Sequence, residues 1–138
     1  MFAIVSELNG WAVLLATLVY FVLGALWFTP LFGKYYDLAL GFDRQKDYKW
    51  PAIYYLSPLV NSLLVSFATA LLVYLLKIEL LADAVALGLI VGIGYAGAIS
   101  FNNAVNPITP RPLLYGAVTG GYHLVGITLV ALIEVALR

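Results

Sequence analysis

Cysteine is absent from the 138-residue sequence, and histidine occurs only once. The lack of cysteine excludes disulfides, thiolate metal sites and cysteine catalysis. A single histidine offers no second imidazole ligand, so we expect neither a bound metal ion nor another cofactor. Charged residues are also scarce, at 10% against about 25% in an average soluble domain. Seven basic side chains balance seven acidic ones, which leaves no positive surplus for binding nucleic acid.

What the sequence has in excess is apolar surface. Hydrophobic residues make up 64% of the chain, and its mean hydropathy is +1.00. A globule of 15.0 kDa cannot bury that much apolar surface. The composition therefore excludes a soluble domain and a disordered chain, and it indicates that the chain is surrounded by a lipid bilayer.

Four apolar stretches are long enough to cross a membrane, which takes about 20 residues. They cover about residues 11–28, 51–76, 81–105 and 113–137. Asn9 is placed to cap the first stretch, and Pro30 to end it. The fold class we predict is all-α: an integral membrane four-helix bundle in which residues 1–138 form a single transmembrane domain.

The connections predict an orientation. Apolar residues recur at helical spacing over 31–42, which favours a short interfacial helix after the first span. Basic residues gather on one side of the membrane, at Lys34, Arg44, Lys46, Lys49 and Arg111, against Lys77 and Arg138 on the other. By the positive-inside rule we expect the 31–50 loop in the cytoplasm and both termini outside the inner membrane of the cell. The first residues lack the basic region of a cleaved signal peptide, so we expect the first span to be retained.

Small residues recur every fourth position in the third span. Helices in lipid associate through such residues, because lipid tails supply no hydrophobic drive between them. The expected packing positions are Ala84, Gly88, Gly92, Ala96 and Ser100 in the third span, with Gly116 and Gly120 in the fourth. Glycines can instead unwind a helix around a substrate, although the long third span favours packing. Because a bundle of four helices is small, we also expect a homo-oligomer.

Two polar residues fall near the middle of spans, His123 in the fourth and Asn61 in the second. An imidazole titrates near neutrality, and an ionisable group at this depth is a functional-site hypothesis. We expect Asn61 to be its hydrogen-bond partner, although both side chains are equally suited to holding helices together. His123 shares a helix face with Glu134, which we expect to lie with Asp83 at the outer interface.

A second polar group lies where the third span ends. It consists of Asn102, Asn103 and Asn106, with Arg111 shortly after them. These side chains could line a vestibule or bind an anionic head group. Asparagines also satisfy exposed carbonyls at a helix end, and that alternative is the stronger one.

The run from Gly24 to Lys34, GALWFTPLFGK, resembles the signature that closes the first span in a bacterial membrane family. This family carries the label "domain of unknown function 1761" and has four predicted spans. His123, which follows Gly120 and Gly121, is similar to the central histidine of its last span. The resemblance implies the architecture and no activity.

Three functions remain open. The leading hypothesis is a non-enzymatic inner-membrane protein that binds or passes a small solute or ion along a polar track from Asn61 and His123 to the 102–106 segment. The second is a membrane enzyme acting on a lipophilic substrate with His123 as acid–base, but no nucleophile or paired carboxylate accompanies it, so we predict no catalytic residue. The third is a structural or assembly subunit.

Overall fold

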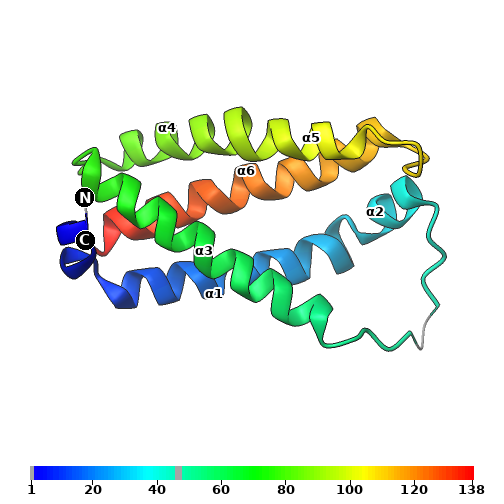
Figure 1. Cartoon of the computed structure of the whole chain (residues 1–138), viewed down its shortest axis with the longest axis horizontal. Coiled ribbons are helices and arrows are strands. Elements are labelled where there is room, and N and C mark those ends of the chain that lie inside the picture. The colour runs from blue at the N-terminus through cyan, green and yellow to red at the C-terminus, as the bar shows by residue number, and fades with distance from the viewer. Residues whose placement is uncertain (1, 46–47) are drawn as a thin grey trace.

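The computed structural model describes residues 2–45 and 48–138, which form helices and connecting segments without a strand (Figure 1). Four helical stretches are long and apolar enough to cross a membrane: Gly10–Leu31, Ile53–Leu75, Leu81–Ala104 and Pro112–Ala136. The predicted all-α class and the four membrane helices are confirmed. The chain is a multi-pass membrane protein.

The first stretch begins after a short 3-10 helix, η1 (Phe2–Glu7), and consists of α1 (Gly10–Leu26) followed by η2 (Trp27–Leu31). Asn9 caps α1 as predicted, because its side-chain oxygen accepts hydrogen bonds from the amides of Trp11 and Ala12 at 3.1 and 3.4 Å. Its side-chain nitrogen donates to the carbonyl of Leu137 at 2.7 Å. Asn9 thus joins the start of the first span to the end of the last.

The first span ends at Leu31, one residue after Pro30, which we expected to end it. The chain widens into the π-helix η2, which contains Pro30 and runs to Leu31. The amide of Phe32 bonds the carbonyl of Trp27, five residues back, at 2.8 Å. A wider turn tolerates a residue that has no N–H and would crowd the preceding carbonyls of an α-helix.

The predicted short helix after the first span is present as α2 (Gly33–Leu40), shorter at both ends than the 31–42 expected. Gly41 ends it with a φ of +64°, in the left-handed region that favours glycine. Arg44 then folds back to bond the carboxylate of Asp37 at 2.7 Å. Of the basic residues behind the predicted orientation, Lys46 lies outside the described residues.

The second span, α3 (Ile53–Leu75), begins two residues after Pro51. Its first nine residues, to Asn61, are exposed on every side. Farther along, one face is buried, and it carries Ser62, Ser66, Thr69, Ala70 and Val73.

The third span has three parts: α4 (Leu81–Val91), the π-helix η3 (Gly92–Gly97) and α5 (Ala98–Ala104). The fourth is α6 (Pro112–Ala136), with Pro112 in its first turn. Each of the other α-helices packs against α6. On one side lie α4 and α5, while α1 and α3 pack against α6 and against each other on the other side (Figure 1).

The two ends of the bundle differ in what they carry. η1, the C-terminal residues and the short α3–α4 connection lie together at one end, while α2, the segments 41–45 and 48–52 and the α5–α6 connection lie at the other (Figure 1). Lys34, Arg44 and Lys49 therefore share an end with Arg111 of the α5–α6 connection, which is the arrangement on which the predicted orientation depends.

Candidate functional site

The centre of the bundle holds a hydrogen bond between the first and last spans. The hydroxyl of Tyr20 lies 2.5 Å from Nδ1 of His123. Tyr20 is the eleventh of 22 residues in its span and His123 the twelfth of 25, so both lie midway along their helices. Tyr20 is 2% exposed, and His123 is half-buried. The only histidine thus has a partner on another helix at mid-span.

A second tyrosine holds this pair in place. The rings of Tyr20 and Tyr122 stack with centroids 4.9 Å apart. The hydroxyl of Tyr122 donates to the backbone carbonyl of Tyr20 at 3.3 Å. Such offset aromatic stacking and the tyrosine hydrogen bonds fix the ring orientations, so the Tyr20 hydroxyl is aimed at the imidazole.

Two glycines make room for these rings. A methyl group at Gly126 would overlap the ring of Tyr20, and one at Gly24 would lie 3.0 Å from the Tyr122 hydroxyl oxygen. Both positions allow α1 and α6 to approach closely around the aromatic cluster. Gly24 opens the run that resembles a family signature, and its role here is to leave space for Tyr122.

The rest of that run packs around the same cluster. The ring nitrogen of Trp27 donates to the carbonyl of Val118 on α6 at 2.9 Å. The Phe28 ring meets Tyr122 edge-on, with centroids 5.1 Å apart. A methyl group at Gly33 would lie 2.7 Å from the Phe28 carbonyl oxygen, so the turn into α2 requires glycine. Trp27 and Phe28 therefore hold η2 against α6, and Gly33 allows the tight turn from η2 into α2.

Comparison with family models gives one match, to "Protein of unknown function (DUF1761)", over residues 11–135. The chain belongs to this family. The resemblance seen in the sequence is confirmed, and the matched region includes all the site residues discussed above. No curated protein and no solved structure matches the chain. Membership in DUF1761 establishes which proteins this chain is related to, and the family's own description assigns no activity.

In this DUF1761 chain, His123 has a different partner from the one expected. Asn61 is exposed on the outer side of α3, and the prediction that it pairs with His123 is wrong. The reason is the rotation of α3: the neighbouring Ser62 is 1% exposed and lies alongside Tyr122, so Asn61, one residue earlier, points away. Sequence reasoning missed Tyr20, because a tyrosine hydroxyl within an apolar run has no periodic signal.

Other buried polar groups follow the same interface. The hydroxyls of Ser62 and Ser66 on α3 make no hydrogen bond within the described part of the chain, and neither does the carboxyl group of Glu134 on α6. Glu134 is 1% exposed, so protein covers its carboxyl group, although it lies two residues before the end of α6, near the end of the bundle where we expected it. Asp83 is exposed near the start of α4. Ser62, Ser66, Thr69 and Val73 are spaced as one helix face, which is the signal that the sequence offered for this side of α3.

The asparagines at and just beyond the end of the third span do not converge on His123. Asn102 and Asn103 are exposed on α5. Asn106 organises the connection to α6: its side-chain nitrogen donates to the Asn103 carbonyl and to the Thr109 hydroxyl, both at 2.8 Å. The backbone amide of Arg111 donates to the carbonyl of Ala39 on α2 at 3.1 Å. These contacts fit the capping alternative for Asn106.

The small-residue positions line the contact between the third and fourth spans. A methyl group at Gly88 would lie 2.5 Å from Cα of Thr128, and one at Gly92 would lie 2.9 Å from Cα of Leu124. Gly116 faces the ring of Phe101, and Gly120 approaches Gly97. Ala84 and Ser100 are buried and Ala96 is partly so. These small residues thus form a contact between two spans of the same chain.

The sequence did not predict that the third span changes helix type. Over Gly92–Gly97 it is a π-helix, where a methyl group at Gly97 would lie 2.9 Å from the Gly92 carbonyl oxygen. Two glycines five residues apart were the available signal. Short π-helical segments occur frequently at functional sites.

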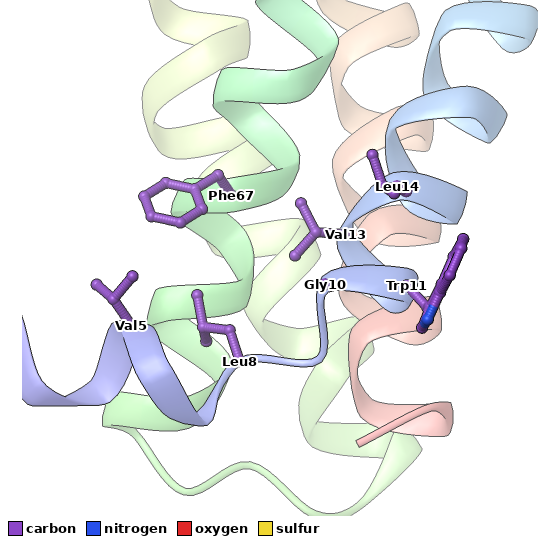
Figure 2. Close-up of a pocket in the computed structure, with 7 residues that line it drawn as sticks. All are labelled: Val5, Leu8, Gly10, Trp11, Val13, Leu14 and Phe67. Carbon is purple, nitrogen blue, oxygen red and sulfur yellow. The ribbon is translucent and has the colours of Figure 1, made fainter.

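Two shallow grooves lie on the surface. One, of about 520 Å³, lies between η1, α1 and α3 and has only apolar side chains along it (Figure 2). Its lining residues are Val5, Leu8, Gly10, Trp11, Val13, Leu14 and Phe67. The other, of about 420 Å³, lies where η2 and α2 meet α6 and includes Trp27, Phe32 and Leu114. His123 lines neither groove.

Proposed function

We propose that this protein resides in the bacterial inner membrane and binds or passes a small ion, the proton, at the Tyr20–His123 pair. The observation that carries the proposal is the hydrogen bond between Tyr20 Oη and His123 Nδ1 at mid-span. We further propose that the 31–50 loop faces the cytoplasm and both termini face outward, because the basic connections share one end of the bundle.

The chemistry of the pair suits a proton. A neutral imidazole donates through one ring nitrogen and accepts through the other, and a tyrosine hydroxyl both donates and accepts. A proton taken up by one of these groups from a neighbour can therefore be passed on, because the other group releases its own proton on the far side; the hydroxyl and the imidazole must then reorient to restore the starting tautomer. Ionisable side chains within membrane spans mark ion pathways and proton relays in many proteins.

The surroundings support the proton over a larger solute. The Tyr20, Tyr122 and His123 rings are packed at centroid distances of 4.9 to 6.3 Å. Neither of the two grooves described above is lined by His123. A proton needs no cavity, whereas a solute needs one of its own size.

This proposal changes the polar track expected from the sequence. Asn61, Asn102 and Asn103 are exposed and Asn106 is used in a turn, so we leave them out. In their place we include Ser62 and Ser66, whose buried hydroxyls lie on the α3 face that packs on the centre of the bundle.

The test is proton flux into proteoliposomes that contain the purified chain and a pH-sensitive dye, driven by a potassium diffusion potential. We expect flux above that of empty vesicles, and a loss of at least tenfold in Tyr20→Phe and in His123→Gln. Tyr95→Phe is the matched control, because it removes the same hydroxyl from a tyrosine that is 66% exposed.

Two results would overturn the proposal. One is flux through the wild-type chain equal to that of empty vesicles at every driving potential. The other is flux that Tyr20→Phe and His123→Gln leave at the level of Tyr95→Phe, because the pair would then have no part in it.

A further inference from the structure

A polar side chain lies on the outer face of the second span, where lipid would surround it. Asn61 is the ninth of 23 residues in α3, about 12 Å along the helix from its first residue. It is exposed, and its amide makes no hydrogen bond within the described residues. Hydrocarbon offers no hydrogen-bond partner, so an amide left alone at this depth is costly.

Asn61 belongs to a regular stripe. Going along α3 in steps of four and three residues, the stripe consists of Ser57, Asn61, Leu64, Ala68, Leu71 and Leu75. This is the spacing at which one helix packs along another in a left-handed pair. The stripe lies opposite the buried face that holds Ser62, Ser66 and Thr69, so packing within the chain leaves all of it exposed except Leu71, which is partly buried.

The first turns of α3 are exposed, and the ring contact between Tyr54 and Trp50, at 5.0 Å, comes from the segment just before the helix and not from another helix. Every residue from Ile53 to Asn61 is exposed, including Tyr54 and Leu56 at 55% and 57%. In Figure 1 this end of α3 lies apart from α5 and the start of α6. The exposed face therefore extends from the beginning of α3 to beyond its middle.

We propose that a second copy of this chain docks on this stripe, with the Asn61 amides of the two copies hydrogen-bonded to each other. Two copies inserted with the same orientation have parallel α3 helices. A two-fold axis along the membrane normal then places each Asn61 opposite itself at the same depth. An amide carries both donors and acceptors, so it is complementary to its own copy.

The rest of the stripe suits a second copy as well. Ser57 and Ala68 are small and allow close approach of two backbones on either side of Asn61. The whole of α3 carries no Asp, Glu, Lys or Arg, so no oppositely charged partner is needed. A single polar residue in such a seam also fixes the register of the two helices.

The absence of cysteine makes the test clean. A single Ala68→Cys substitution places a thiol on the stripe, and Ala86→Cys on the exposed side of α4 is the matched control. Under mild oxidation in membranes that contain the full chain, we expect a covalent dimer from Ala68→Cys and not from Ala86→Cys. Its molecular mass must be that of two copies.

The role of the amide is tested in the same background. Asn61→Leu removes the hydrogen bond and we expect it to weaken dimerisation about 3- to 30-fold, as measured by fluorescence energy transfer on dilution in lipid. Asn61→Gln keeps an amide and is expected to restore most of the affinity. Because Asn61 is exposed, both variants should retain the helical circular dichroism of the parent chain.

Several outcomes would overturn the inference. They are a chain that stays monomeric at all lipid dilutions, dimerisation that Asn61→Leu leaves unchanged, or cross-linking at Ala86→Cys equal to that at Ala68→Cys. Cross-linking of Ala68→Cys to a different polypeptide, with no dimer of this chain, would assign the face to another protein.

Discussion

Gly126 on α6 lies directly against the ring of Tyr20 on α1, so closely that the ring occupies the place of a side chain. The same ring stacks on Tyr122 and carries the hydroxyl that reaches His123. One missing methyl group therefore determines where the central hydrogen bond can form. This relationship links helix packing to the proposed chemistry.

The first prediction concerns this contact. Gly126→Ala should lower the free energy of unfolding by about 1–3 kcal/mol, because overpacking forces Tyr20 or the α6 backbone to move. Unfolding of the purified chain in mixed micelles, followed by circular dichroism, measures the change. Gly94→Ala is the control: a methyl group there meets nothing within 4 Å, so the free energy should stay the same or rise slightly. Equal losses in the two variants would contradict the proposed close contact.

The second prediction is energetic coupling between the members of the pair. Tyr20→Phe and His123→Leu, alone and together, form a double-mutant cycle. We expect a coupling energy of about 0.6 kcal/mol and not more than about 2 kcal/mol, the range measured for hydrogen bonds between membrane helices. The parallel cycle with Tyr95→Phe should give additive changes. Additivity in both cycles would mean that the hydrogen bond contributes nothing to stability.

The third prediction concerns the contact between α4 and α6. At Gly88 a methyl group would meet the backbone of Thr128, which cannot turn aside as a side chain can. Gly88→Ala should therefore separate the two helices and destabilise the chain by about 1–3 kcal/mol, despite the better helix propensity of alanine. A thermal unfolding series with Gly94→Ala as reference decides this, and a stability equal to that of the reference would remove Gly88 from the helix contact.

The fourth prediction is a dependence on alkaline pH. Burial raises the pKa of Tyr36 on α2 to about 12, and the adjacent Tyr115 adds to the effect. In the unfolded chain this tyrosine ionises near pH 10, so the unfolded state loses its proton first and stability falls as the pH rises from about 10 to about 12.

Tyr36→Phe removes this group. Below pH 10 the Tyr36 hydroxyl is protonated in both the folded and the unfolded state, so Tyr36 should add no pH dependence to the stability there. Between pH 10 and 12 the variant should lose less stability than the parent chain. Ultraviolet titration of tyrosinate should also lose one tyrosine's share of the absorbance change near pH 12 in Tyr36→Phe, while Tyr35→Phe, which changes an exposed neighbour, should keep it. The same absorbance change near pH 12 in both variants would contradict a buried Tyr36.

Most of the fold was predictable because a helix that crosses a bilayer must be long and apolar, and both properties can be read from a sequence. Length and hydropathy locate the spans, a capping asparagine begins the first one, and periodic apolar residues indicate α2. The structure departs from these predictions where local geometry decides: Pro30 lies inside a π-helix and not after the helix end. Hydropathy contains no information about a change of helix type.

The candidate site was only half predictable. A lone histidine at mid-span is conspicuous, and His123 is at the centre of the bundle. Its partner was not conspicuous, since Tyr20 is one of 10 tyrosines. Whether Asn61 or Ser62 faces inward depends on a rotation of about 100° between successive residues of α3. That rotation is fixed by packing against α1 and α6, which the sequence of α3 alone does not describe.

The central place of α6 has a consequence for how the protein is made. Every other α-helix rests on α6, yet ribosomes synthesise this helix after all of them. The first three spans therefore enter the bilayer before α6 is available to pack against, and Gly88 and Gly92 of the third span face lipid until α6 is inserted. A chain that stops before Pro112 would keep the contact between α1 and α3 but would lack the helix against which all the other α-helices pack.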